Sequence, residues 1–233
     1  MITFRKRTKS AICALCCIVI MIALCTDAVG SSPLEQSRSR GDSVEGADTA
    51  ILTIVSDAGK SEGNHGVPCY GHTFLVLENT GDEKLIFCGR VLEPGENITF
   101  GWWAISSHGG VWFGLESNYI DAYGRYPDRV SLSRVICAEG IYRLADYLLA
   151  NDVYTPLENC AVRAVAAFNA ALAEDRELKS GYFTTPARVS RQIIAHGGTY
   201  EEARALDFTE QLPSCGFGDD VEYYYFVIKK AAG

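Results

Sequence analysis

Short apolar runs separated by turn residues dominate the first half of the folded region. Ala50 to Val55 is one such run, and His72 to Glu78 is a second. Runs of this length, rich in β-branched and aromatic residues, predict buried strands. A third run, Lys84 to Arg90, follows the turn residues Asn79 to Asp82, so the pattern predicts that the second and third runs form a hairpin.

The same criteria predict further strands downstream. The runs Asn97 to Trp103 and Val111 to Glu116 extend the series to a meander of about five strands. Val130 to Ile136 is also strand-like, and so is Val221 to Lys229 near the end of the chain. A short helical segment fits Asn118 to Tyr123.

The hydrophobic period then changes to that of a helix. Apolar positions recur at helical spacing from Ile141 to Leu149 and again from Cys160 to Ala173, where many of them are alanine. Thr185-Pro186 is a helix-start signature for Ala187 to Ala195, and Tyr200 to Leu206 fits another short helix. Strands first, then helices, then a final strand predict an α+β fold in which helices cover one face of a mainly antiparallel sheet.

The N-terminal segment differs in composition from the rest of the chain. A basic start is followed by an uncharged apolar run from Ala11 to Cys25 and by the small residues Ala28-Val29-Gly30. This order is typical of a secretory signal with cleavage near Gly30-Ser31, so we expect a secreted or cell-envelope protein. An uncleaved membrane anchor is the alternative, and in either case we expect contact with a membrane only through this segment.

Composition also sets the domain limits and the class of partner. Residues 31–48 are polar and rich in serine and charge, which predicts a flexible linker between the signal, residues 1–30, and a single domain, residues 49–233. The net charge of -8 repels phosphate backbones, so we do not expect a nucleic acid partner.

Of the nine cysteines, five follow the signal, and an odd number leaves at least one thiol unpaired in an oxidising compartment.

One of these five cysteines, Cys160, lies where a reactive thiol is expected. It follows Asn159, a good N-cap residue, so it is the predicted first residue of a helix. Unpaired backbone N–H groups and the helix dipole stabilise a thiolate at that position. His72, at the start of a predicted strand, is the expected general base for such a nucleophile. The alternative is a buried cysteine that fills a small gap in an alanine-rich helix.

Gly71-His72 before an apolar strand, and Asn159-Cys160 at the start of a small-residue helix, resemble the circularly permuted branch of the papain-like superfamily. That branch includes relatives of lecithin retinol acyltransferase and permuted NlpC-type cell-wall amidases. The resemblance covers approximately Pro68 to Leu172. It implies a cysteine hydrolase or acyltransferase with Cys160 as nucleophile and His72 as base, a peptide, amide or ester substrate, and no metal or organic cofactor.

In that family a third polar residue orients the histidine, and the resemblance places it on the strand after the histidine strand. If the predicted hairpin pairs evenly, residues 88–90 lie opposite His72, and none of them suits the role. The remaining candidates are His108, in a glycine-flanked loop, and Glu116, at the end of an apolar strand, with Asn97 behind them. The alternative for His108 is an exposed loop residue, and for Glu116 a capping residue.

Two other functions compete for parts of this region. His65, Cys69 and His72 have the H-x3-C-x2-H spacing of a zinc site, although no second local pair follows them. Sugars stack on aromatic faces, and a set of aromatic residues occurs between positions 102 and 126: Trp102, Trp103, Trp112, Phe113, Tyr119, Tyr123 and Tyr126. The adjacent Trp102 and Trp103 must point to opposite faces of a strand. The sequence therefore leaves two classes open, an exported thiol hydrolase and a catalytically inactive envelope- or glycan-binding module on the same fold.

Overall fold

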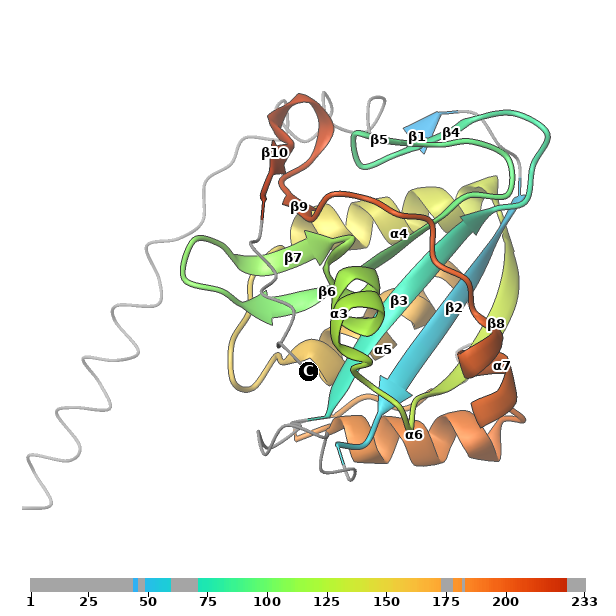
Figure 1. Cartoon of the computed structure of the whole chain (residues 1–233), viewed down its shortest axis with the longest axis vertical. Coiled ribbons are helices and arrows are strands. Elements are labelled where there is room, and N and C mark those ends of the chain that lie inside the picture. The colour runs from blue at the N-terminus through green and yellow to red at the C-terminus, as the bar shows by residue number, and fades with distance from the viewer. Residues whose placement is uncertain (1–43, 46–48, 60–70, 173–177, 182, 226–233) are drawn as a thin grey trace, which may run out of the picture. The chain divides into compact units, whose positions relative to one another are not determined.

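The computed structural model describes residues 44–45, 49–59, 71–172, 178–181 and 183–225 (Figure 1). The chain divides into two units, Met1–Arg38 and Ser39–Gly233, and the described residues all belong to the second. The predicted signal segment and most of the predicted linker lie outside the described residues.

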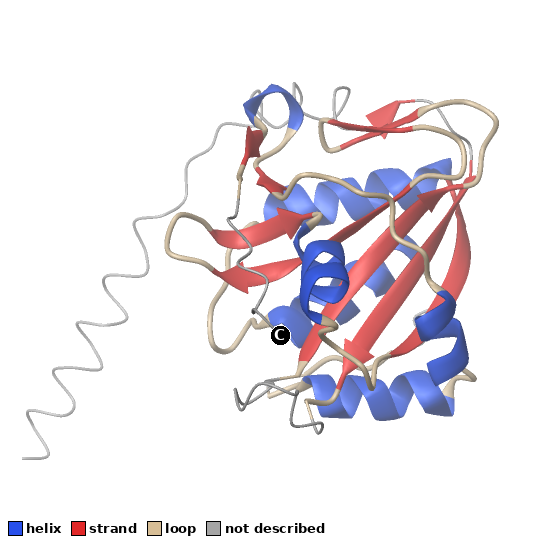
Figure 2. Ribbon diagram, viewed as in Figure 1, coloured by secondary structure: helices blue, strands red, loops and turns tan. Residues whose placement is uncertain are grey.

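Seven antiparallel strands form the main sheet, in the order β10-β9-β7-β6-β3-β2-β8 (Figure 2). Their bounds are β2 (Thr49–Asp57), β3 (His72–Asn79), β6 (Asn97–Ala104), β7 (Gly109–Phe113), β8 (Val130–Cys137), β9 (Ser214–Cys215) and β10 (Glu222–Tyr223). The long central strands match the apolar runs in the sequence, because each is buried on both faces over most of its length.

Helices lie on both sides of this sheet. Their bounds are α3 (Leu115–Tyr123), α4 (Ala138–Ala150), α5 (Cys160–Leu172), α6 (Pro186–Ala195) and α7 (Tyr200–Ala205). In the view of Figure 1, α3 lies in front of the sheet and α4 and α5 lie behind it. The predicted α+β class with a mostly antiparallel sheet is therefore confirmed, but the prediction that helices cover only one face of the sheet is wrong, because α3 packs on the face opposite α4 and α5.

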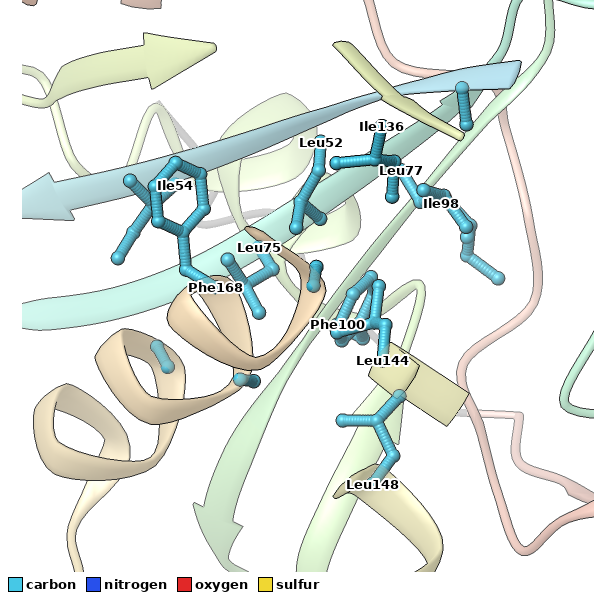
Figure 3. Close-up of a cluster of buried hydrophobic side chains, with 14 of the residues drawn as sticks. Leu52, Ile54, Leu75, Leu77, Ile98, Phe100, Ile136, Leu144, Leu148 and Phe168 are labelled. Atoms are coloured by element: carbon cyan, nitrogen blue, oxygen red, sulfur yellow. The ribbon is translucent and has the colours of Figure 1, made fainter. Parts of the chain in front are cut away.

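The alanine-rich helix α5 packs directly against the sheet. Ala161 and Ala164 are fully buried, and their small side chains let the helix backbone approach the strands closely. Phe168 lies among Leu75 and Ile54 from the two central strands (Figure 3). This packing fixes α5 against β3, so the first residue of the helix is held near the start of that strand.

The hairpin predicted between His72–Glu78 and Lys84–Arg90 is wrong, because β3 pairs with β2 on one side and with β6 on the other. Asn79 explains the difference. Its side-chain amide donates to the carbonyls of Glu83 and Leu92, at 2.8 and 2.9 Å, and its backbone N–H donates to the residue just before β6. These bonds close a long excursion at its base, so the chain leaves the sheet after β3 and returns to it at β6.

The excursion folds as a small sheet of its own. β4 (Leu85–Phe87) and β5 (Arg90–Leu92) form a hairpin, and β1 (Val44–Glu45) adds to the edge of β4. Cys88 and Gly89 between β4 and β5 have φ values of 52° and 79°, the left-handed pair that closes a two-residue hairpin. β1 falls within the segment predicted as a flexible linker, so that part of the segment is paired, with the edge of β4 as its partner.

The strand predicted over Val111–Glu116 ends earlier than expected. β7 stops at Phe113, Gly114 has a φ of 68°, and α3 begins at the next residue. Glycine adopts this left-handed conformation without steric cost, so it allows the chain to turn sharply from strand to helix. The Ser117 hydroxyl donates to the Gly114 carbonyl at 3.1 Å and ties the first turn together. Glu116 therefore lies in the first turn of a helix and not at the end of a strand.

The predicted helices after α5 are confirmed where the structure describes them. Thr185 is the N-cap of α6, and its side chain accepts a hydrogen bond from the Arg188 backbone N–H. None of the helices in the described ranges is both long enough and apolar enough to span a bilayer. The final strand predicted over Val221–Lys229 is described only in part, as β10, because residues 226–233 lie outside the described ranges.

Candidate active site

The predicted cap at the start of α5 is confirmed. Asn159 Oδ1 accepts hydrogen bonds from the backbone N–H groups of Ala161 and Val162, at 3.0 and 3.2 Å. Cys160 is the first residue of α5 and is buried, with 9% of its surface exposed. Its thiol therefore lies where the dipole of the helix favours a thiolate.

His72 is the first residue of β3 and lies opposite Asp57, the last residue of β2. Gly71 precedes it at a point of close approach between chain segments. A Cβ atom at residue 71 would lie 2.5 Å from the Asp57 carbonyl oxygen and 3.0 Å from the Pro186 Cβ. The glycine of the Gly-His motif therefore lets β3 begin directly against the end of β2 and the start of α6, which fixes the position of the histidine.

Cys160 and His72 lie close enough for each to shift the pKa of the other. Burial alone lowers the pKa of His72, but the negative charge of the Cys160 thiolate and hydrogen bonds to Cys160 and Glu116 raise it to about 9. Burial likewise raises the pKa of Cys160, yet the His72 charge and the hydrogen bonds that the sulfur accepts bring it below its ordinary value. Both shifts favour a thiolate–imidazolium pair near neutral pH.

The backbone N–H groups of Thr73 in β3 and Ala161 in α5 lie beside the Cys160 sulfur and help to lower its pKa. The pairing of β3 with β6 runs from Leu75 to Glu78, so Thr73 lies beyond its end. At this point β3 directs an N–H group to the thiol. Donors beside a nucleophilic sulfur also lie close to the oxygen of a carbonyl that it attacks, so they are suited to stabilise an oxyanion.

Glu116 supplies the third polar group beside the imidazole. Its Oε1 lies 3.1 Å from His72 Nε2, and the carboxylate is fully buried. Because Nε2 bonds to Glu116, the other ring nitrogen, Nδ1, is the one available to Cys160. In space, the nucleophile Cys160 lies next to the base His72, and His72 lies next to the orienting carboxylate of Glu116. The structure therefore brings together three of the residues singled out in the sequence.

Two residues that the sequence did not single out for this role hold Glu116 in place. The Trp103 Nε1–H donates to Glu116 Oε1 at 2.7 Å. A Cβ at Gly101 would lie less than 3.0 Å from the same oxygen and 3.3 Å from His72 Nε2. Because Gly101 has no side chain, it leaves a space beside β6, and the contact between the Glu116 carboxylate and the His72 imidazole occupies that space. A glycine inside an apolar strand run is a signal of close approach, and this signal was present in the sequence.

Aromatic rings surround the imidazole. The ring centroids of Trp103, Tyr126 and Phe74 lie 4.4, 5.5 and 5.8 Å from its own, and together they keep water from the histidine. Trp102 points the other way, is buried in the core, and donates its N–H to the loop before α5. The prediction that the adjacent tryptophans point to opposite faces is therefore confirmed. Trp112 and Phe113, offered as part of a sugar-binding face, are also fully buried.

His108, the other candidate for orienting His72, has a different partner. Its Nε2 lies 2.9 Å from Asp152 Oδ1, and that oxygen also accepts the backbone N–H of Val111 at 2.7 Å. This contact ties the β6–β7 loop to the loop that leads into α5. The structure therefore assigns the position beside the imidazole to Glu116 and gives His108 a place in an adjacent loop contact.

The zinc hypothesis requires His65 and Cys69, which lie outside the described residues. Within the described part of the chain, no group of three His, Cys, Asp or Glu side chains is placed to hold a metal ion. Four cysteines are described there, all free thiols: Cys88, Cys137, Cys160 and Cys215. Cys88 illustrates the contrast with Cys160, since burial without a basic partner of comparable effect raises its pKa to about 12.

We compared the chain with protein families, curated proteins and solved structures. No family model matches it, and no similar curated protein or solved structure was found. The chemistry of the candidate site is therefore inferred from the contacts of its own residues.

Proposed function

We propose that this protein is a thiol hydrolase or acyltransferase of the permuted papain-like kind, acting on an amide bond of a peptide or of cell-envelope material. The observation that supports this proposal is the buried pair Cys160 and His72, whose pKa values shift toward the thiolate and the imidazolium, together with the contact of His72 with Glu116. A buried cysteine that only fills space needs neither the histidine nor the buried carboxylate.

The reaction begins with attack of the Cys160 thiolate on the substrate carbonyl carbon. Negative charge moves to the carbonyl oxygen, where nearby backbone N–H groups stabilise it. The His72 imidazolium then gives its Nδ1 proton to the leaving amine, the carbon–nitrogen bond breaks, and a thioester to Cys160 remains. Water, or the hydroxyl or amine of an acceptor, loses a proton to His72 and attacks the thioester, which releases the product and restores the ion pair.

Glu116 acts on this cycle through the histidine. By accepting the Nε2–H hydrogen bond it keeps Nδ1 directed at the thiol, and its charge stabilises the imidazolium whenever the thiolate is present. No proton needs to reach the carboxylate itself. The proposed chemistry therefore requires side chains and backbone only, without a metal or organic cofactor.

The order of elements supports the permuted papain-like assignment. His72 comes first, on a central strand of an antiparallel sheet, and Cys160 follows at the start of a helix packed on that strand. The basic and apolar N-terminal segment supports export, which fits a substrate in the cell envelope. Export remains part of the proposal.

Alkylation of the folded protein tests the proposed nucleophile. We expect iodoacetamide at pH 6 to modify Cys160 faster than Cys137, an exposed cysteine that serves as an internal reference, with both rates measured by mass mapping. His72→Ala should remove the advantage. If native Cys160 reacts more slowly than Cys137, or only after denaturation, the enzyme proposal fails and the inactive binding module on the same fold becomes the better explanation.

A further inference from the structure

Large apolar side chains are exposed on the two loops that border the start of α5. Val153 and Leu157, on the loop that precedes Cys160, are 47% and 55% exposed, and Phe183 is 76% exposed. Asn159, the cap of α5, joins these loops, because its Nδ2 donates to the Thr184 carbonyl at 3.3 Å. Leucine and phenylalanine side chains left in water carry a free-energy cost, which is recovered when an apolar ligand covers them.

Phe183 is held in an unusual backbone conformation. Its φ is 69°, a left-handed value that bulky residues seldom adopt and that costs free energy. The following residue, Thr184, is fully buried and fixes the turn, since its backbone N–H and its hydroxyl both donate to the Gly181 carbonyl, at 3.0 and 2.8 Å. The turn therefore holds the Phe183 backbone next to Thr184, whose carbonyl is bonded to the cap of Cys160, and leaves the ring exposed to solvent.

The loop that carries Leu157 is also anchored. The Tyr154 backbone N–H donates to the Gly109 carbonyl at 2.9 Å. At its far end Glu158 accepts a hydrogen bond from Arg163 Nη2 at 2.6 Å, so the charge next to Leu157 is already paired within the protein. The loop before Cys160 is thus anchored near both ends, it exposes the apolar side chains of Val153 and Leu157, and the carboxylate next to Leu157 is already paired.

We propose that Phe183 and Leu157 form a subsite for an apolar amino-acid side chain of the substrate, adjacent to the carbonyl that Cys160 attacks. This inference rests on the proposed function, because it assigns Cys160 as the nucleophile. Because Glu158 is already paired with Arg163, it does not attract a charged substrate side chain. A charged group placed against Phe183 and Leu157 would lose hydration without gaining a partner.

A set of alkylating probes that differ only in side chain tests the subsite. The probes are N-iodoacetyl-leucinamide, N-iodoacetyl-glycinamide and N-iodoacetyl-glutamate amide, with N-octyl-iodoacetamide as a lipid-like comparison. Each rate at Cys160 is divided by the rate of the same probe with free N-acetylcysteine. We expect this relative rate to be about tenfold or more higher for the leucine probe than for the glycine probe. For the glutamate probe it should be lower than for the glycine probe.

Two variants and a matched control separate the subsite from the fold. Phe183→Asn suits a left-handed backbone, so this variant should fold at least as stably as the parent while losing most of the leucine preference. Leu157→Ser should lose part of it. Val135→Ser removes an apolar side chain that is 72% exposed on the edge strand β8, and the preference should not change.

The outcomes distinguish the two proposals. If Cys160 reacts rapidly with iodoacetamide but equally with the leucine and glycine probes, the subsite is refuted and the nucleophile stands. If the octyl probe is favoured and the leucine probe is not, the commitment to an amino-acid side chain is refuted. If Cys160 reacts with none of the probes in the native protein, the proposed function itself fails.

Discussion

Replacement of Gly101 by alanine is the most selective perturbation of the candidate site. The added methyl group would lie in a buried part of β6, and the atoms nearest to it belong to Glu116, Phe74 and His72. Its closest approach would be to Glu116 Oε1, at less than 3.0 Å, with the Phe74 Cβ at 3.2 Å and His72 Nε2 at 3.3 Å. The carboxylate oxygen is therefore the atom that has to move furthest.

The size of the effect follows from the contacts of that oxygen. Oε1 lies 3.1 Å from His72 Nε2 and 2.7 Å from Trp103 Nε1. A displacement of about 1 Å removes it from hydrogen-bond reach of at least one of these donors. A lost charge-assisted hydrogen bond costs about 1.5–3 kcal/mol, which corresponds to a reduction of about 10- to 150-fold in the rate of a step that depends on the imidazolium.

The assay is the rate of Cys160 alkylation by iodoacetamide at pH 6, followed together with the thermal unfolding midpoint. Gly109→Ala is the matched control, because a Cβ there has no heavy atom within 4 Å and the residue lies on the paired strand β7. We expect Gly101→Ala to slow alkylation and to lower stability by about 1–3 kcal/mol through overpacking. Gly109→Ala should change neither by more than about twofold or 0.5 kcal/mol.

One result would refute the role given to Glu116. If Gly101→Ala loses stability as expected but alkylates Cys160 at the parent rate, the Glu116–His72 contact has no influence on the thiolate. In Gly101→Ala the displaced carboxylate could still contact His72 in another orientation, so the same measurement is made on Glu116→Gln. Gln keeps an acceptor oxygen but removes the charge, so it should also slow alkylation.

Three further predictions follow from the same contacts. The alkylation rate of Cys160 should be nearly constant across neutral pH: its thiolate forms below the ordinary thiol pKa, and the imidazolium that stabilises it is present at low pH and is lost only as pH rises through about 9. In His72→Ala the rate should instead rise steeply with pH, and an identical profile in parent and variant would contradict the pairing. Trp103→Phe keeps a ring beside His72 but removes the donor to Glu116, so we expect alkylation to slow by about three- to tenfold at unchanged fold, as judged by circular dichroism. His108→Ala should lower the free energy of unfolding by about 1 kcal/mol in urea titration and leave Cys160 alkylation within about twofold, because its partner lies in a separate loop contact.

The start of α5 could be predicted from sequence because its determinants are local. The side chain of Asn159 bonds to N–H groups two and three residues away, so the position of Cys160 at the helix start follows from neighbouring residues alone. The same holds for His72 at the head of β3, which an apolar run and a preceding glycine mark directly. Local sequence signals are therefore sufficient to single out both the candidate nucleophile and its base.

The orienting residue could not be predicted in the same way, because its position depends on distant pairing. The prediction that residues 88–90 lie opposite His72 assumed that the turn after β3 forms a hairpin, and Asn79 instead closes an excursion across more than ten residues of chain. The apolar run continues across Gly114 without interruption, so the pattern predicts a strand that includes Glu116. Its approach to His72 requires both the strand-to-helix turn and the gap at Gly101.

Burial explains why the site needs contributions from so many elements. The aromatic rings around His72 and the packing around Cys160 each favour the neutral form of the group that they enclose. The charged pair is favoured first because the Cys160 and His72 charges stabilise each other, and Glu116 from α3, Thr73 from β3 and the helix start of α5 add to that stabilisation. Each of these groups alone is a common structural contact, and here they act on the same pair. The convergence of three elements on one buried pair is therefore the feature that separates a nucleophile from an ordinary core cysteine.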